Sequence, residues 1–253
     1  MIKKFITLFK LGRKIASSDI LEIISKFQKP PLAITLLFKF LAISFSPKKK
    51  GSIKSEGERL SDSLESMGTT FIKLGQFLAT RPDIIGESLS KQLENLQDKL
   101  PPFPLIQAKE IIKNDLGQET YESIINLSEP VAAASIAQVH KAQIDDNGTI
   151  KDVAIKILRP NIKKIFNDEI DAIMLFAFLV ESFIKKTKRL KLVEVVFLLK
   201  EITNLEMDLR FEAAAANEYA ENTKNDVGFR VPEIYWNFTS ENVMTLDLSL
   251  IHI

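Results

Sequence analysis

The chain of 253 residues contains no cysteine, only two histidines and little glycine or proline. The lack of cysteine excludes disulfides, zinc–thiolate sites and cysteine nucleophiles. His140 and His252 are too few for a histidine-rich metal site, so we expect no metal ligands from this chain. An apolar fraction of 45% with nine glycines and ten prolines is typical of a mostly helical globular protein. The length suits one large domain or two small ones.

The apolar run at residues 32–45 is too short to cross a membrane, because a spanning helix needs about 20 apolar residues. Lys39 also interrupts this run. The N-terminus lacks a small-residue cleavage site, so we do not interpret it as a secretory signal. The run therefore predicts a segment that lies in the membrane interface, with Lys39 reaching toward water, or one that packs on a core.

Basic residues are concentrated at the N-terminal end. Residues 1–54 hold twelve Lys or Arg against two acidic residues, a net charge of about +10, which leaves about −9 for the rest. The first 19 residues interleave phenylalanine and isoleucine with lysine and arginine, a pattern that suits an anionic membrane surface. A pair of surface helices with a solvated basic face is the alternative. A nucleic-acid partner is not expected, because few aromatic residues are placed for stacking.

The apolar spacing between residues 60 and 78 predicts one amphipathic helix, with Leu74 and Leu78 in its core stripe. Lys73 and Gln76 then project together from the opposite side, since they are three residues apart. A solvated face would explain them equally well. Gly75 favours a closer contact, because a glycine inside a helix costs about 1 kcal/mol relative to alanine unless something approaches the backbone.

The segment 131–160 predicts two antiparallel strands joined by the turn Asp146-Asn147-Gly148. In the second strand, Val153, Ile155 and Ile157 share one face and Lys156 lies on the other. One lysine in a V-A-I-K sequence is the pattern of the third strand of a protein kinase, where it pairs with the phosphates of ATP and with a helix carboxylate. An apolar strand with an incidental lysine is the alternative.

A kinase carries a small-residue loop over the ATP phosphates, two strands before that lysine strand. Alanine there lets the backbone approach phosphate, although less freely than glycine. The loop predicted to contact the nucleotide consists of Ala132, Ala133, Ala134, Ser135, Ile136 and Ala137.

The segment 192–222 predicts one long helix that carries the partner carboxylates. Asp208 and Glu212 are four residues apart and share a face of such a helix, whereas Glu206 points elsewhere. Three acids in seven residues also occur on an ordinary solvated face. The preceding lysine strand and small-residue loop favour the functional interpretation.

Four sequences in this order resemble the UbiB family, the atypical kinase-like proteins of ubiquinone biosynthesis. They are KLGQ at 73–76, AAASIAQVH at 132–140, VAIKILRP at 153–160, and EMD at 206–208 followed by EAAAANE. The resemblance covers roughly residues 56–250. It implies an α+β fold: a protein-kinase-like small lobe of antiparallel sheet plus helix, with a helical N-terminal extension that closes the nucleotide cleft as a lid.

The resemblance also assigns roles to single residues. Lys73 and Gln76 would face the active site, with Lys73 pairing with Glu206 or Asp208. Lys156 would hold the phosphates of ATP and pair with Glu212. Such proteins resemble ATPases or small-molecule kinases that act on lipid and quinone intermediates, and the alanine loop with its lid argues against a conventional protein kinase.

The sequence departs from the family after Met244, where we expect the kinase hinge and instead find TLDLSLIHI. We expect these nine residues to fit no kinase element, as after a frameshift or early stop, and we expect the large lobe with its Mg²⁺ ligands to be missing. The predicted organisation is a basic arm and linker at 1–55, the lid extension at 56–125 and the truncated small lobe at 126–253.

Two functions remain open at this point. One is the N-terminal part of a UbiB-like ATPase that uses ATP and Mg²⁺ and supports the polyprenylphenol hydroxylation stage of ubiquinone synthesis. It would be peripheral to the cytoplasmic face of a bacterial inner membrane and would act on a lipid or quinone precursor. Its expected partners are ubiquinone biosynthesis proteins or a second fragment that carries the large lobe. The other is a catalytically inactive fragment that binds membrane or partners.

Overall fold

The computed structural model describes residues 55–94, 96, 100–183 and 185–248. The predicted basic arm at 1–54 and the last five residues lie outside the described part. The chain forms two compact units, and each is discontinuous in sequence. Unit 1 contains residues up to 98 and 164–201, and unit 2 contains 99–163 and 202–253. Residues 99–125, which we assigned to the lid extension, therefore belong to the unit that holds the sheet.

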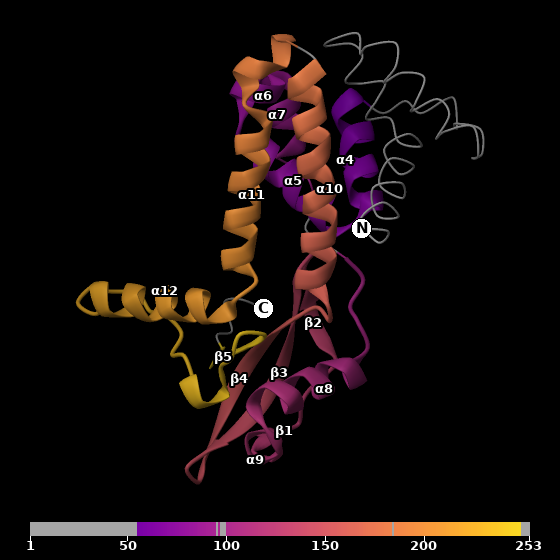
Figure 1. Cartoon of the computed structure of the whole chain (residues 1–253). Helices are drawn as coiled ribbons and strands as arrows, with labels where there is room; N and C mark the ends of the chain where they lie inside the picture. Colours follow the sequence, from indigo (N-terminus) through magenta and orange to yellow (C-terminus); the bar gives the residue numbers. More distant parts are fainter. Residues whose placement is uncertain (1–54, 95, 97–99, 184, 249–253) are drawn as a thin grey trace. The chain divides into compact units, whose positions relative to one another are not determined.

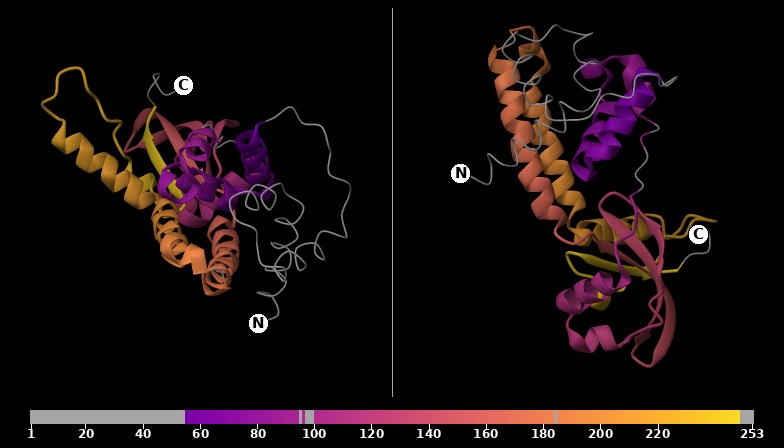
Figure 2. Two further views of the ribbon diagram at one scale, coloured as in Figure 1. Left: turned by 90° about the horizontal axis from the view of Figure 1, so that it is seen from above. Right: turned by 90° about the vertical axis from the view of Figure 1, so that its right-hand side faces the viewer.

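The described residues of unit 1 are mainly helical. Between residues 55 and 94 they form four short helices: α4 (Glu56–Met67), α5 (Thr69–Ala79), α6 (Pro82–Ile85) and α7 (Glu87–Leu93). Most of α10 (Ile162–Phe183) and α11 (Leu192–Glu206) belong to the same unit and lie side by side, joined by the 3₁₀ helix η1 (Lys185–Leu190) (Figures 1 and 2). No described helix is both long and apolar enough to cross a bilayer.

The single helix predicted across residues 60–78 is wrong, because the chain breaks it at Gly68. This glycine adopts φ +101°, a backbone conformation that other residues avoid, and it ends α4 and begins α5. Ser55 starts α4 with a reciprocal capping box to Glu58. The break also rotates the core stripe. Phe71, Ile72 and Gly75 are buried in α5, whereas Leu74 and Leu78 are only half-buried.

Unit 2 is built on an antiparallel sheet in the order β1-β3-β4-β5, with β2 also paired to β3. The strands are β1 (Ile124–Ile125), β2 (Pro130–Ala133), β3 (Ala137–Asp146), β4 (Thr149–Leu158) and β5 (Val243–Asp247). Its helices are α8 (Leu105–Leu116), α9 (Gln118–Glu122) and α12 (Leu209–Asn222), with the 3₁₀ helix η2 (Trp236–Phe238) before β5. The predicted α+β fold, with an antiparallel sheet and helices, is confirmed.

The β3–β4 hairpin has the predicted turn and faces. Asn147 and Gly148 both have positive φ, 54° and 85°, as a two-residue turn between right-twisted strands requires. Val153, Ile155 and Ile157 are fully buried against α8, in a core that includes Phe103, Ala108 and Ile112. Lys156, alternating with them, therefore faces the other side of the sheet.

Two further expectations are corrected in unit 2. The long helix at 192–222 is interrupted at Met207 and Asp208, so that α11 ends and α12 begins there. The tail from Thr245 was expected to fit no kinase element, but Thr245, Leu246 and Asp247 pair with β4 and complete the sheet. This pairing could not be seen in the sequence, because the paired residues lie far apart in the chain, as Ile155 and Thr245 do.

Candidate nucleotide site

Lys156 and Glu212 meet at the centre of the candidate site. The Lys156 Nζ donates to both carboxylate oxygens of Glu212, each at 2.6 Å. Lys156 lies near the C-terminal end of β4, where it pairs with Val139 and Met244 on the two neighbouring strands. Glu212 lies in the first turn of α12, where a carboxylate also complements the helix dipole. The pair that the resemblance implied is thus present, and the ammonium group is held in one orientation.

The interruption after α11 determines how Glu212 is presented. Asp208 caps α12 by accepting from the N–H of Arg210, and its two oxygens also receive the Arg210 guanidinium at 2.9 and 2.7 Å. The hydrogen bond from Arg210 lowers the pKa of Asp208. Met207 and Leu209 are fully buried on either side of this residue and fix the start of α12. Asp208 therefore positions the helix and does not share a continuous helical face with Glu212.

The small-residue loop lies where it was predicted, directly before β3. Ala132 and Ala133 end β2, Ala134 to Ile136 form the turn, and Ala137 begins β3. The turn is closed by a hydrogen bond from the Ala134 N–H to the Ala137 carbonyl, 2.8 Å. The segment is thus a tight β-hairpin whose strand β3 runs beside the Lys156 strand.

Arg159, which sequence analysis missed, binds the backbone of the turn. Its guanidinium donates twice to the Ala134 carbonyl, and once each to the carbonyls of Leu100 and Pro101. The only signal was its place in ILRP, one residue after the Lys156 strand.

Sequence analysis also missed a row of buried, hydrogen-bonded polar side chains. Gln138 exchanges two hydrogen bonds with the backbone of Phe103 and contacts His140 Nε2 at 2.9 Å. His140 Nδ1 lies 2.7 Å from the Ser128 carbonyl, so Nδ1 carries the proton and Nε2 accepts from Gln138. Burial lowers the pKa of His140. Two polar residues alternating on a core face of a strand, at 138 and 140, were the available signal.

The remaining predicted residues are divided between the units. Lys73 and Gln76 are half-buried on α5 in unit 1, whereas Glu206 and Asp208 belong to unit 2. The pairing of Lys73 with either acid would join the two units and stays a prediction. Gly75 has a local explanation, because a Cβ there would lie 2.7 Å from Leu64 Cδ1 and 2.5 Å from Leu96 Cδ2. The close approach that we inferred at Gly75 thus exists, and its partners are two core leucines of unit 1.

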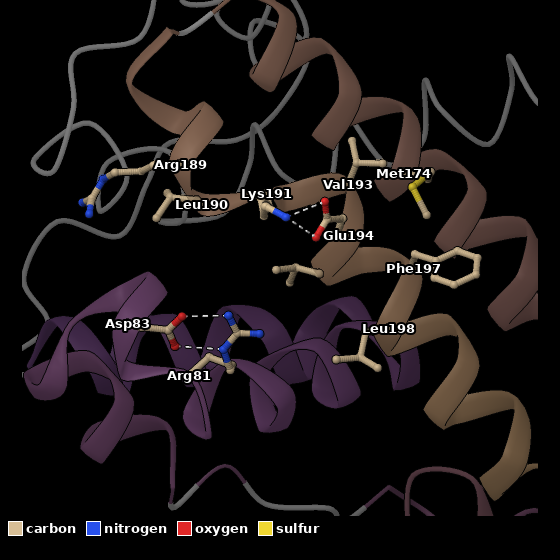
Figure 3. A pocket seen from close by; sticks show the side chains of 11 residues that line it. Arg81, Asp83, Met174, Arg189, Leu190, Lys191, Val193, Glu194, Phe197 and Leu198 are labelled. Atoms are coloured by element: carbon tan, nitrogen blue, oxygen red, sulfur yellow. Dashed lines mark hydrogen bonds and ion pairs between the residues drawn. The ribbon is translucent and has the colours of Figure 1, made fainter.

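A separate pocket of about 810 Å³ lies within unit 1, between Arg81 and Asp83 at the start of α6 and the end of the α10–α11 hairpin (Figure 3). Its walls are mainly apolar, from Met174, Leu190, Val193, Val195, Phe197 and Leu198. Its charged groups are largely paired with one another, Arg81 with Asp83 and Lys191 with Glu194. It contains none of the residues that resemble a nucleotide site. Among the described residues, no three His, Cys, Asp or Glu side chains are grouped to hold a metal ion.

Comparison with known proteins now agrees with this geometry. Residues 95–249 match the ABC1 atypical kinase-like domain. The chain belongs to the ABC1 atypical kinase-like family. The match includes β5, so the strand formed by residues 243–247 is part of the family domain.

Curated relatives of this ABC1 chain carry the name "Probable protein kinase UbiB". The chain is 38% identical to that of Marinobacter nauticus over 194 residues, which is 76% of this chain and 35% of the relative. It is 36% identical to that of Cellvibrio japonicus over 218 residues, 86% of this chain and 38% of the relative. It is 31% identical to that of Pseudomonas paraeruginosa over 244 residues, which is 96% of this chain and 45% of the relative. The chain thus spans less than half the length of these relatives.

Proposed function

We propose that this chain is the nucleotide-binding small lobe of a UbiB-like ATPase or small-molecule kinase. The observation that carries the proposal is the Lys156–Glu212 ion pair, on the strand that neighbours the hairpin of small residues. In a kinase fold, this lysine contacts the α- and β-phosphates and the helix carboxylate orients it. The residues present fit the phosphate end of ATP, since a held ammonium group is the donor that phosphate oxygens require.

ATP would supply the phosphoryl group, with Mg²⁺ to neutralise its charge. In this proposal, Lys156 binds phosphate oxygens, Glu212 holds the ammonium in place, and residues 132–137 let the backbone come near. Lys73, Gln76, Glu206 and Asp208 would line the same site by the resemblance. The Mg²⁺ ligands and the residue that positions the acceptor would come from the rest of the kinase fold.

The wider role follows from the name of the relatives and from the resemblance. We place the protein in ubiquinone biosynthesis, at the polyprenylphenol hydroxylation stage, with a lipid or quinone precursor as substrate. The basic residues of 1–54 support attachment to an anionic membrane surface, at the cytoplasmic face of a bacterial inner membrane. Other ubiquinone biosynthesis proteins, or a second polypeptide with a large lobe, are the proposed protein partners.

The test is nucleotide binding by the chain itself, with a fluorescent ATP analogue, with and without Mg²⁺. Lys156→Met removes the ammonium group with little change in volume and should weaken binding at least tenfold. Lys141→Met is the matched control, because Lys141 lies on the same face of the sheet in the neighbouring strand, opposite Ala154. Equal losses in both variants would show that binding responds to general charge, and would remove the basis for the assigned site.

Turnover distinguishes the two candidate functions. Binding that depends on Lys156 without measurable ATP hydrolysis would favour a nucleotide-dependent binding module. Hydrolysis that is lost in Lys156→Met would favour the enzyme. The membrane role is tested separately with anionic vesicles at low salt, where electrostatic attraction is strongest. A lack of vesicle binding under those conditions would contradict it.

A further inference from the structure

The loop that resembles a phosphate-binding segment is held by more backbone contacts than a flexible glycine-rich loop would have. Arg159 contacts both ends of the turn. Its guanidinium Nε and Nη2 donate to the Ala134 carbonyl at 3.0 and 2.8 Å. Its own peptide N–H donates to the Ile136 carbonyl at 2.8 Å. The residue that holds the loop thus follows directly after the strand that carries Lys156.

The same side chain is itself held on its other edge. Nη1 and Nη2 donate to the carbonyls of Pro101 and Leu100 at 2.9 and 3.2 Å. The guanidinium lies 5.9 Å from the centre of the Phe103 ring, a cation–π distance. Phe103 is in turn fixed to β3 by its two backbone hydrogen bonds with Gln138. Arg159 therefore joins the loop to a rigid segment and cannot change its position without breaking several contacts.

The direction of these contacts matters for phosphate binding. Phe103 belongs to the core on the α8 face of the sheet, with Ile155 and Ile157. Lys156 lies on the opposite face, where it meets Glu212 on α12. Arg159 thus draws the carbonyl of Ala134 toward the α8 side. A carbonyl oxygen turned toward phosphate would repel it, and a carbonyl turned away directs the N–H of the same planar peptide to the other side.

We infer that Arg159 is a positioning residue for the nucleotide loop. It replaces the conformational freedom of a glycine-rich loop with a single fixed conformation, in which the carbonyl of Ala134 is held away from the face that carries Lys156 and the carbonyl of Ile136 is bonded to the Arg159 peptide N–H. The inference deepens the proposed function and rests on it for the identity of the ligand. The fixed loop itself follows from the contacts alone.

Lysine cannot reproduce the planar fork of arginine. In Arg159→Lys, one ammonium group cannot serve the carbonyls of Ala134, Leu100 and Pro101 together. We expect amide hydrogen exchange at residues 133–137 and at Phe103 to increase at least tenfold in the nucleotide-free chain. Exchange in the β3–β4 centre, at 142–144 and 153–155, should remain as in the unmodified chain. Affinity for the fluorescent ATP analogue should fall about tenfold, whereas Arg159→Gln should lose more.

Arg230→Lys is the control, because Arg230 is another guanidinium of unit 2, and it donates to the Asp247 side chain at the edge of the sheet. It should change neither loop exchange nor affinity. The inference is overturned if loop exchange is unchanged in Arg159→Lys, or if it rises together with exchange throughout the sheet, which would indicate general destabilisation. It is also overturned if loop exchange rises while the affinity of a nucleotide-binding chain stays the same.

If the unmodified chain binds no nucleotide, the proposed function fails while the exchange measurement still decides whether Arg159 fixes the loop. The two failures are therefore distinguishable. A loop that stays fixed without Arg159 contradicts the inference even in a chain that binds ATP.

Discussion

At the scale of single residues, unit 2 uses polar groups at positions where a core would ordinarily be apolar. Gln138, His140 and Thr245 are almost fully buried, and each has hydrogen-bond partners. Asp115 on α8 accepts from the hydroxyl of Ser240 and from the backbone and side chain of Asn242, which fixes the turn before β5. Because a buried polar group without a partner costs about 1–3 kcal/mol, each link determines where its neighbours can lie.

The first prediction concerns His140 and pH. Burial lowers its pKa in the folded chain below the unfolded value of about 6.5. Protonation therefore favours the unfolded state, and the stabilisation present above pH 6.5 is lost as the pH falls through the folded pKa. The protonated ring would also lose its acceptor for Gln138.

Urea unfolding at pH 7.5 and 5.5 measures this effect. His140→Gln should be less stable at pH 7.5 by about 1–3 kcal/mol, since the Ser128 carbonyl or Gln138 loses its partner. Its free energy of unfolding should depend less on pH over this interval. An equal pH dependence in the two proteins would show that other groups are responsible.

The second prediction concerns Gly75. Alanine gains about 1 kcal/mol of helix propensity, but its Cβ would overlap Leu64 and Leu96, and overpacking costs about 1–3 kcal/mol. Gly75→Ala should therefore lower the free energy of unfolding slightly in the unmodified chain. In a background with both Leu64→Ala and Leu96→Ala, space is available and the same substitution should stabilise. Unchanged effects in the two backgrounds, with weaker nucleotide binding, would instead favour a role for Gly75 at the nucleotide cleft.

At the scale of elements, the sequence predicted strands better than helix boundaries. Alternation and the Asn147-Gly148 turn are local signals, and they sufficed for the β3–β4 hairpin. The kinase-like motif sufficed for the Lys156–Glu212 pair. Periodicity alone did not reveal the breaks at Gly68 and Asp208, because an apolar stripe can continue across a cap. Strand β5 and the contacts of Arg159 depend on segments that are distant in sequence, so a local sequence pattern cannot predict them.

The break before α12 gives the third prediction. Asp208→Ala removes the side-chain cap and should lower the free energy of unfolding by about 1 kcal/mol. Asp208→Asn keeps an oxygen at the cap and should lose much less. Arg210→Gln removes only the ion pair of an exposed guanidinium and should change the free energy of unfolding much less than Asp208→Ala does.

Thermal and urea unfolding of these three variants separate the cap from the charge. If Asp208→Asn were as unstable as Asp208→Ala, the ion pair with Arg210 would be the important interaction. If the two Asp208 variants kept the stability of the unmodified chain but bound nucleotide more weakly, Asp208 would have the direct role that the resemblance implies.

At the scale of the whole molecule, the chain leaves unit 2 after β4, forms the α10–α11 hairpin in unit 1, and returns to unit 2 for α12 and β5. The candidate site therefore depends on residues from both sides of the α10–α11 hairpin in sequence, Lys156 before it and Glu212 after it. Each unit has its own buried core, around Ile72 and Leu93 in unit 1 and around Ile112 and Ile155 in unit 2. Separate cores permit separate opening reactions.

The last prediction tests this division with two matched cavities. Ile112→Ala and Ile72→Ala each remove a fully buried isoleucine side chain, one from unit 2 and one from unit 1, at a cost of about 2–5 kcal/mol. In Ile112→Ala, hydrogen exchange should accelerate in α8, β3, β4, α12 and β5, and remain unchanged in α5 and α7. In Ile72→Ala it should accelerate in α4, α5 and α7, while the sheet stays protected. The informative segment is α12, which follows the α10–α11 hairpin in sequence. Its hydrogen exchange should nevertheless accelerate in Ile112→Ala and not in Ile72→Ala. If both variants accelerated exchange equally in both units, the chain would open as one cooperative body, and substitutions in α5 could not be assumed to leave the Lys156 site intact.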